Sequence, residues 1–427
     1  MPIDAKLIAA FLIVALATAT LTIIGMNFMT GERKVEERIQ PRYAVADPQF
    51  LRSMGTLLGP SIKGGNRVEA LTNGDEIFPE MLRAIRSATR TITFETFIYW
   101  SGSIGKEFAD ALSERARAGV KVHVLLDWLG SGKIDPSLLQ EMKASGVHLQ
   151  MYHPLRWYTL SRMNNRTHRK ILVVDGKIGF TGGVGIADPW LGHAQDPDHW
   201  RDTHFRMDGP AVGELQAAFM DNWLKTEGEV LHGEEYFPEV PPSGDALAQV
   251  FTSSASGGAE SARLMYLMSI ASARRSVRVS AAYFVPDDLS VETLLDARKR
   301  GVVVEIILPG DQIDARVVRK ASRARWGALL RAGVEIYEYV PTMYHCKVMI
   351  VDDLWVSVGS TNFDSRSFRL NDEANLNVFD EAFARAQVAH FEADRGKARR
   401  VTLQAWEDRP WTEKVAEHAA ALLRSQL

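Results

Sequence analysis

The sequence predicts an α/β protein made of two similar domains that follow an N-terminal transmembrane helix. An uncharged apolar run near the N-terminus indicates the membrane helix. The remaining chain repeats one order of helices, glycines and β-branched strands twice, which indicates two matching halves. Matching halves favour a single site at a pseudo-two-fold axis between them. We therefore expect one domain at residues 67–245 and a second at 246–427.

The composition is that of a large globular chain. Its 427 residues, 46% of them apolar, suffice for two sizeable cores. Lysine and arginine number 50 against 53 acidic residues, which gives a net charge of −3 without long runs of either sign. This balance disfavours nucleic acid as a partner, because its backbone requires a basic face. The single cysteine, Cys346, excludes an internal disulfide and leaves too little thiol for a structural zinc site.

The segment Leu7–Gly31 is 25 residues long and carries no charge. As a helix it would measure about 37 Å, enough to cross a bilayer core with some tilt. A cleaved signal peptide is the alternative, because Ala15–Ala17 resembles a cleavage site, although signal cores usually span only about 7–15 residues. One basic residue precedes the segment and four follow it soon after. The positive-inside rule then places the body in the cytoplasm, behind a single-pass anchor.

Residues 32–66 are expected to form a linker between the anchor and the first domain. Their start is charged, and proline and glycine recur in the later part. A short apolar helix is predicted within them, around Phe50–Leu58.

Three landmarks of the repeat are structural. A helix leading into a strand occurs at 81–98 and again at 267–280. A glycine followed by a β-branched strand then occurs twice in each half, at Gly119 and Gly146 and at Gly301 and Gly333. A helix-ending glycine before such a strand is typical of βαβ units.

The fourth landmark is a motif with identical spacing in both halves. The first copy contains His168, Lys170, Asp175 and Gly182-Gly183, and the second contains His345, Lys347, Asp352 and Gly359-Ser360, followed by Asn362. A further strand repeats downstream, with Asp202 and Glu373 at equivalent places.

The motif supplies the groups that phosphoryl transfer needs. On a strand, side chains two residues apart share a face, so each half presents an imidazole beside an ammonium. Two lysines can clamp a phosphate while one histidine attacks phosphorus and the other protonates the leaving oxygen. The lysines and glycine-rich amides neutralise the developing charge, so no metal or other cofactor is required. Asp202 and Glu373 are candidates to orient the histidines, since a carboxylate on one ring nitrogen fixes the tautomer.

Several residues keep two interpretations. Asp175 precedes a glycine as in a hairpin turn, so Asp175 and Asp352 either hold turns or touch the substrate. Glu95, near the end of a buried strand, either makes a structural hydrogen bond or faces the site. A metal is not expected at the downstream cluster, because its spacing fits no standard zinc pattern. That cluster comprises His193, Asp196, Asp198, His199 and His204.

The first half also carries about ten extra residues, around positions 153–167, that have no counterpart in the second half. The insertion is apolar and basic, with Leu155, Trp157 and Tyr158 beside Arg156 and Arg162. Such side chains suit a membrane interface with anionic headgroups, although packing against the other half is the alternative.

The duplicated motif resembles the phospholipase D superfamily, from about Val68 to the carboxyl end. Within it, the segments Asn165–Ile171, Gly359–Phe368 and Leu370–Glu373 are similar to bacterial cardiolipin synthases. The resemblance implies two fused phospholipase D-like domains, each a sheet flanked by helices, with the site in the cleft between them. It also implies a phosphohistidine intermediate, with His168 as nucleophile and His345 as acid and base. Gly183, Ser360 and Asn362 are then expected to bind or orient the substrate.

We expect a phosphatidyltransferase of the bacterial cell membrane that makes cardiolipin from phosphatidylglycerol. Phospholipase D hydrolysis is the alternative, since only the acceptor differs. A nuclease is disfavoured by the charge balance and by the membrane segment. The sequence departs from the family at Gly185, where the first motif usually ends in asparagine. A catalytically inactive lipid-binding protein is therefore a further alternative.

Overall fold

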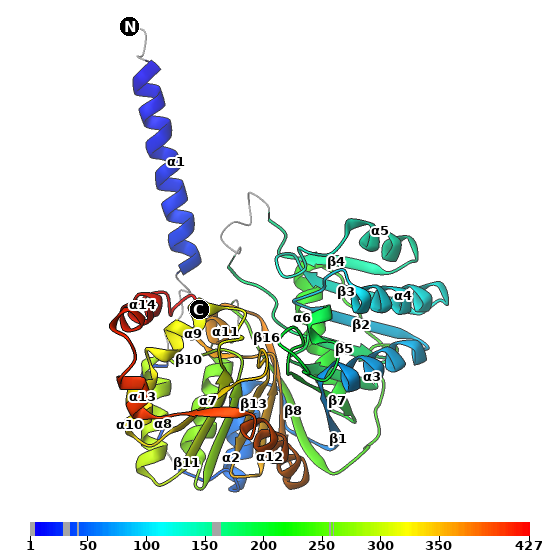
Figure 1. The fold of residues 1–427 in the computed structure, drawn as a ribbon. Coiled ribbons are helices and arrows are strands. Elements are labelled where there is room, and N and C mark those ends of the chain that lie inside the picture. Colours follow the sequence, from blue (N-terminus) through cyan, green and yellow to red (C-terminus); the bar gives the residue numbers. More distant parts are fainter. Residues whose placement is uncertain (1–4, 29–34, 41, 156–163, 256–257, 259) are drawn as a thin grey trace.

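The computed structural model describes residues 5–28, 35–40, 42–155, 164–255, 258 and 260–427. The chain begins with helix α1 (Ala5–Phe28), which Figure 1 shows standing away from the body. Within the described residues, α1 is the one helix long and apolar enough to cross a membrane, over Ala5–Ile23. Residues 29–31, the end of the predicted anchor, lie outside the described residues.

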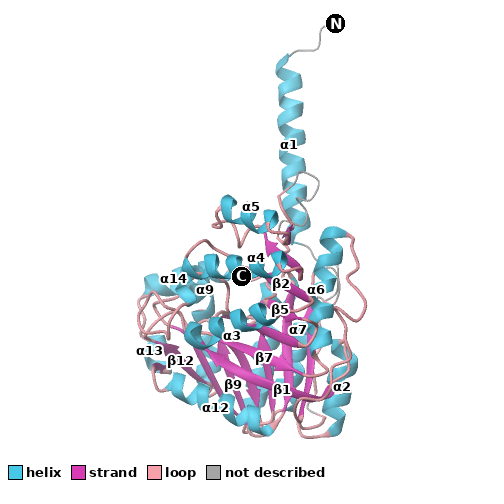
Figure 2. Cartoon of the chain, turned by 90° about the vertical axis from the view of Figure 1, so that its right-hand side faces the viewer, coloured by secondary structure: helices cyan, strands magenta, loops and turns pink. Residues whose placement is uncertain are grey.

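The body is built on one mixed sheet that runs through both halves. In the described part of the chain its order is β17-β12-β11-β9-β13-β14-β16-β8-β1-β7-β6-β5-β2-β3-β4. The order on either side of the β8–β1 junction is the same, apart from the extra edge strand β17. The predicted α/β fold of two similar halves is therefore confirmed, and Figure 2 shows helices packed against the strands.

In the first half, β2, β3 and β4 are parallel, and the other neighbours are antiparallel. The strands are β1 (Lys63–Thr72), β2 (Thr91–Thr96), β3 (Lys121–Asp127), β4 (His148–Tyr152), β5 (Ile171–Val174), β6 (Ile178–Gly182) and β7 (Thr203–Asp208). The helices are α3 (Asn73–Ser87), α4 (Ser103–Arg117), α5 (Pro136–Ala144), α6 (Val212–Glu227) and the 3₁₀ turn Asp188–Trp190.

In the second half, β9, β11 and β12 are the equivalent parallel strands. Its strands are β8 (Ala246–Ser253), β9 (Ser276–Ala281), β10 (Phe284–Val285), β11 (Val303–Pro309), β12 (Glu335–Tyr339), β13 (Lys347–Val351), β14 (Trp355–Gly359), β15 (Phe363–Asp364), β16 (Glu373–Phe379) and β17 (Ala398–Val401). Its helices are α7 (Ser261–Ser272), α8 (Asp288–Lys299), α9 (Arg316–Arg323), α10 (Trp326–Arg331), α11 (Ser365–Arg369), α12 (Glu381–Arg395), α13 (Leu403–Glu407) and α14 (Trp411–Ala421).

The segment expected to be a linker contains the short apolar helix that was predicted within it. Helix α2 (Pro48–Leu58) occupies its middle, capped by the side chain of Asp47, and buries Phe50, Met54 and Leu58. These side chains belong to the core cluster of the second half, together with residues of α7 and β9. Strand β1 then starts at Lys63, before the expected domain boundary. An amphipathic helix can bury its apolar stripe only on a partner, and here the partner comes from far along the chain.

The topology places both motifs at one end of the sheet. Strand β13 runs antiparallel to β9, so its first residue, Lys347, pairs with Ala281 at the carboxyl end of β9. Strand β5 stands in the same relation to β2. Each histidine precedes its strand, β5 or β13, and therefore lies at the carboxyl ends of the parallel strands, where α/β proteins commonly bind ligands.

Candidate active site

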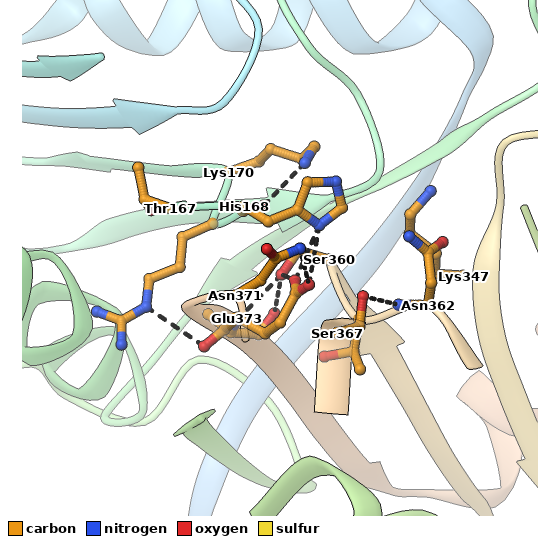
Figure 3. Close-up of polar contacts among 12 residues, drawn as sticks. Thr167, His168, Lys170, Lys347, Ser360, Asn362, Ser367, Asn371 and Glu373 are labelled. Carbon is orange, nitrogen blue, oxygen red and sulfur yellow. Dashed lines mark hydrogen bonds and ion pairs between the residues drawn. The ribbon is translucent and has the colours of Figure 1, made fainter. Parts of the chain in front are cut away.

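The imidazole of His168 is oriented by a carboxylate from the other half of the chain. Its Nδ1 lies 3.0 Å from both carboxylate oxygens of Glu373, on β16. The Ser360 hydroxyl donates to Glu373 Oε2 at 2.5 Å. Figure 3 shows these contacts converging on the Glu373 carboxylate. A carboxylate that accepts from Nδ1 leaves Nε2 as the free nitrogen of a neutral imidazole.

The second histidine repeats the arrangement with the halves exchanged. His345 Nδ1 lies 2.7 Å from Asp202 Oδ2, just before β7 of the first half. The indole of Trp190 donates to the same oxygen at 2.9 Å, and the backbone N–H of Thr203 donates to Oδ1 at 2.8 Å. Both histidines are thus held by carboxylates that belong to the opposite half.

Two isolated backbone bridges explain this exchange. Thr167, just before His168, bridges to Asp372, just before Glu373, and Tyr344 bridges to Arg201 in the same way. The N–H of His168 donates to the Asp372 carbonyl at 2.8 Å, and the N–H of His345 donates to the Arg201 carbonyl at 2.8 Å. Each bridge sets a histidine beside a carboxylate across the interface, so the site depends on the two halves packing together.

The two lysines lie with their own histidines and point into the same site. Lys170 Nζ donates to the His168 carbonyl, and Lys347 Nζ donates to the His345 carbonyl, each at 2.8 Å. Lys347 Nζ also lies 3.2 Å from both ring nitrogens of His345. The lysines are buried, and each ammonium retains donor capacity that a phosphate oxygen can use.

Burial governs the charge states of these groups. Burial lowers the pKa of His168 to about 4, against the opposing effect of Glu373. Burial and the Lys347 charge lower the pKa of His345 as well. Burial alone would raise the pKa of Glu373 and of Asp202, but their histidine and lysine neighbours hold both below the usual range. At neutral pH the free site therefore contains neutral histidines beside ionised carboxylates.

The lysine charges repel each other. Burial, together with the charge of Lys347, lowers the pKa of Lys170 to about 7. Burial also lowers the pKa of Lys347. Two ammonium groups buried near each other are destabilised by mutual repulsion and by the loss of water. A phosphate bound between them would neutralise their charges.

The residues after the two glycine-rich turns are not equivalent. At Gly183 a side chain would collide with Asp202, because a Cβ atom would lie 2.2 Å from Oδ1. At the matching position Ser360 uses its hydroxyl to hold Glu373. Asn362 is buried beside Lys347 in Figure 3, with its backbone N–H donating to Ser367 at 3.2 Å. Among the described residues, its Oδ1 has no hydrogen-bond partner.

Gly185, where the family pattern has asparagine, lies against Ile98 and Trp190. A Cβ there would lie 2.8 Å from Ile98 Cβ and 3.2 Å from Trp190 Cζ3. The space of the missing side chain is therefore taken by the indole that holds Asp202.

Aromatic side chains that neither repeated motif predicted form two walls of the site. Trp190 and Trp200 pack on His345 with ring centroids 5.4 and 5.5 Å away, and Phe97 packs on His168 at 5.3 Å. Trp200 begins the repeated segment that contains Asp202, so its place in the repeat was an available signal. Phe97 follows β2 directly, at the strand end where ligands bind.

Asp175 and Asp352 lie at the far ends of β5 and β13, away from the histidines. Asp175 accepts hydrogen bonds from the backbone N–H groups of Thr89, Arg90 and Thr91. Asp352 accepts equivalent bonds from residues 274–276. Both have positive φ, 52° and 54°, as tight turns require. Their positions correspond to the turn-holding interpretation and separate them from the phosphate-binding groups.

Glu95 is fully buried and bonds to Thr167 Oγ1 and Asn222 Nδ2 rather than to either histidine. Burial raises the pKa of its carboxyl to about 7, although the Arg169 charge lowers it. Thr167 and His168 are adjacent and point to opposite faces. Glu95 therefore supports the segment before His168 from behind, which corresponds to the structural interpretation.

The acidic and histidine cluster is dispersed. His193 lies 3.2 Å from Asp75, His199 lies 2.7 Å from Asp196, and His204 is buried apart in β7. Among the residues that the structure describes, no group of three or more His, Cys, Asp or Glu side chains is placed to hold a metal ion. Of the insertion, Leu155 is exposed, and Arg156, Trp157, Tyr158 and Arg162 lie outside the described residues.

Two His-x-Lys pairs at the junction of duplicated α/β halves define a phosphoryl-transfer protein of the phospholipase D type. A family model described as "Cardiolipin synthase, PLD-like domain" matches residues 81–196 and 266–395, and these ranges contain both pairs. The chain therefore belongs to the cardiolipin synthase family of phospholipase D-like enzymes.

Individual relatives agree with this family. The chain is 34% identical to cardiolipin synthase 2 of Bacillus anthracis, over 92% of this chain and 77% of the relative. It is 33% identical to the major cardiolipin synthase ClsA of Bacillus subtilis, over 84% of this chain and 75% of the relative. The fold matches the crystal structure of phosphatidylserine synthase from Haemophilus influenzae with a TM-score of 0.64 at 14% identity, covering 89% of this chain and all (100%) of the other.

Proposed function

We propose that this enzyme transfers a phosphatidyl group from one phosphatidylglycerol to another and so makes cardiolipin, with His168 as the covalent nucleophile. The observation that carries the proposal is the pair of buried histidines, each oriented by a carboxylate from the opposite half beside two buried lysines. The names of the relatives support the choice of products.

In the first step, His168 Nε2 attacks phosphorus and the bond from phosphorus to the headgroup oxygen breaks. His345 gives a proton to that oxygen, and glycerol leaves. The bound anion favours the protonated form of His345, which offsets the effect of burial on its pKa. The product of this step is a phosphatidyl group joined to His168 through a P–N bond.

In the second step, His345 takes the proton from a glycerol hydroxyl of the second phosphatidylglycerol. The oxygen attacks phosphorus, the P–N bond breaks, and cardiolipin leaves with His168 neutral again. Lys170, Lys347 and the amide of Asn362 would bind the phosphoryl oxygens and stabilise the charge that develops on them. If water replaced the alcohol, the same site would release phosphatidic acid.

The substrates also place the enzyme at a membrane. We propose that α1 anchors it as a single-pass protein of the bacterial cell membrane, with the body on the cytoplasmic side. The length and composition of α1 and the basic residues that follow it support this arrangement.

The covalent step can be tested by separating the roles of the two histidines. A phosphatidyl ester of p-nitrophenol needs no proton on its leaving group, so His345→Ala should release p-nitrophenol in a single burst. The phosphatidyl group should then remain on the protein, and mass spectrometry should locate it on residue 168. His168→Ala should give no burst. A burst in His168→Ala with the adduct on His345 would reverse the assignment.

The acceptor is tested with wild-type enzyme and labelled phosphatidylglycerol. Cardiolipin and glycerol in equal amounts are expected. Phosphatidic acid as the main product would replace the transferase by a hydrolase, and no product would overturn both.

A further inference from the structure

Helix α14 presents its apolar side chains outward. Trp411, Val415 and Leu422 are 74%, 58% and 84% exposed. Their spacing of four and seven residues places them on one face of the helix, and Leu422 keeps helical dihedral angles at the C-cap. A soluble helix normally turns such a face inward, so this stripe indicates a partner outside the described body.

The exposure does not come from a loosely docked helix. The opposite face of α14 buries Ala420 against Val285, Val318 and Ala321, in one small core. Glu417 on that face is also buried and bonds to Arg323 and Arg409, each at 2.8 Å. Because a buried ion pair is costly to break, α14 is fixed with its apolar stripe outside.

The stripe lies at the end of the body to which α1 is joined. The residues after α14, Arg424, Ser425 and Gln426, line one cavity together with Val35 and Glu36, the first described residues after α1. The Val35 carbonyl accepts a hydrogen bond from Arg263 at 2.7 Å, which ties this segment to the body. Figure 1 shows α14 at the end of the body nearest α1, and Figure 2 shows the same end from the side.

The same end of the body carries the candidate active site. Val285 of β10, which packs on α14 through Ala420, follows the carboxyl end of β9. That end of β9 pairs with Lys347. Helix α14 therefore packs on the side of the molecule that carries the active site, where the substrate must enter.

We propose that α14 lies in the headgroup region of the membrane that α1 spans, with Trp411, Val415 and Leu422 inserted among the lipids. This inference rests on the proposed function, because it takes α1 as the anchor. Tryptophan suits the interface, and an amphipathic helix of this kind binds lipid through its buried apolar area. Arg316 and Lys320 on α9, and Arg424 just after α14, are exposed basic side chains that anionic phosphatidylglycerol would attract.

Two contacts with the membrane, through α1 and through α14, would fix the orientation of the body, which a single contact does not. Contact through α1 alone fixes the body to the bilayer at one point. Contact through both α1 and α14 would hold the active-site end against the bilayer, where both lipid substrates are found.

The contact is tested with a fluorophore that reports water. Cys346 is buried, so the variant Val415→Cys can be labelled selectively at position 415 in the full-length protein. In vesicles that contain phosphatidylglycerol, the label should shift to the blue and be quenched by nitroxide lipids. The matched control is Leu57→Cys, 55% exposed on α2 at the opposite end of the body in Figure 1. It should stay in water.

If the label at position 415 showed the same emission wavelength and the same lack of quenching as the label at position 57, the proposal would be overturned. In detergent, shielding of the Val415 label that increases with protein concentration would mean that a second copy of the chain covers the stripe. This result would overturn the proposal as well. The label reports contact without turnover, so its failure is distinct from failure of the proposed reaction.

Substitution gives a second readout. The triple variant Trp411→Ser, Val415→Ser, Leu422→Ser should lower activity on vesicle lipid about tenfold, because weaker interfacial binding loses the orientation of the body. Its activity on dissolved short-chain phosphatidylglycerol and its unfolding temperature should equal those of the wild type. Equal activity on vesicles would contradict the proposal.

Discussion

Among the groups of the active site, Lys170 has a protonation state that changes near neutral pH. Burial and Lys347 lower its pKa to about 7 in the free enzyme. A bound phosphate favours the charged form and raises that pKa again. Affinity for an anionic headgroup and the charge of Lys170 are thus linked.

We predict that kcat/KM falls as pH rises above about 7, because Lys170 loses its proton and the free site loses a cation. The corresponding limb of kcat should lie at higher pH, since substrate holds the proton. Lys170→Arg keeps the charge at every pH and should flatten the kcat/KM limb. A wild-type profile without this limb between about pH 6 and about pH 9 would contradict the prediction.

A second prediction concerns Gly185, where the family pattern has asparagine. Gly185→Asn should not improve activity but should destabilise the protein by about 1–3 kcal/mol, because overpacking displaces Ile98 or Trp190. Loss of the Trp190 bond to Asp202 should also lower kcat. Thermal unfolding and kinetics measure both effects. The control Gly213→Asn lies on α6 in open space and should keep kcat, and an active, fully stable Gly185→Asn would show that the site can accept the amide.

At the scale of elements, the exchange between β7 and β16 makes the halves interdependent. Strand β7 directly follows Asp202 and β16 begins with Glu373, and each of these carboxylates orients the histidine of the other half. The bridges from Thr167 to Asp372 and from Arg201 to Tyr344 hold that exchange in register. Neither half contains a complete site, so activity requires the junction.

Helix α2 provides the prediction at this scale. Phe50 packs edge-on against Trp355 with ring centroids 5.0 Å apart and is fully buried. Phe50→Ala should therefore lower the free energy of unfolding by about 3–5 kcal/mol. Denaturant titration measures this loss. The exposed neighbour Gln49→Ala is the control and should change stability by less than about 0.5 kcal/mol. Equal stability of both variants would mean that residues 48–58 act only as a linker.

For the whole molecule, the prediction is the side of the membrane on which the body lies. Ser243 is exposed and Cys346 is buried, so Ser243→Cys supplies a single reactive thiol. An impermeant maleimide should label it in lysed cells and not in intact spheroplasts, because four basic residues follow the span. Labelling in intact spheroplasts would place the body outside.

The sequence by itself determined the features that depend on local order. The uncharged run predicted one apolar helix. Two similar α/β halves were predicted by the repeated order of a glycine followed by a strand and by the two motifs with equal spacing. These signals are visible in the sequence because periodicity and turn chemistry are local properties. The spacing predicted that each histidine and the lysine two residues later lie together on a strand, whereas His168, Lys170 and His345 precede strands β5 and β13 and only Lys347 lies in one.

Tertiary structure alone decided which carboxylate faces which histidine. Asp202 and Glu373 were both expected to orient, but spacing within one half contains no information about pairing across the junction. The same reason explains α2, whose apolar stripe is visible in the sequence while its partner near Trp355 is about 300 residues away. The role of Glu95 was also decided by the tertiary structure. Glu95 bonds to Thr167 and Asn222, and the sequence does not show which face of its buried strand a helix covers.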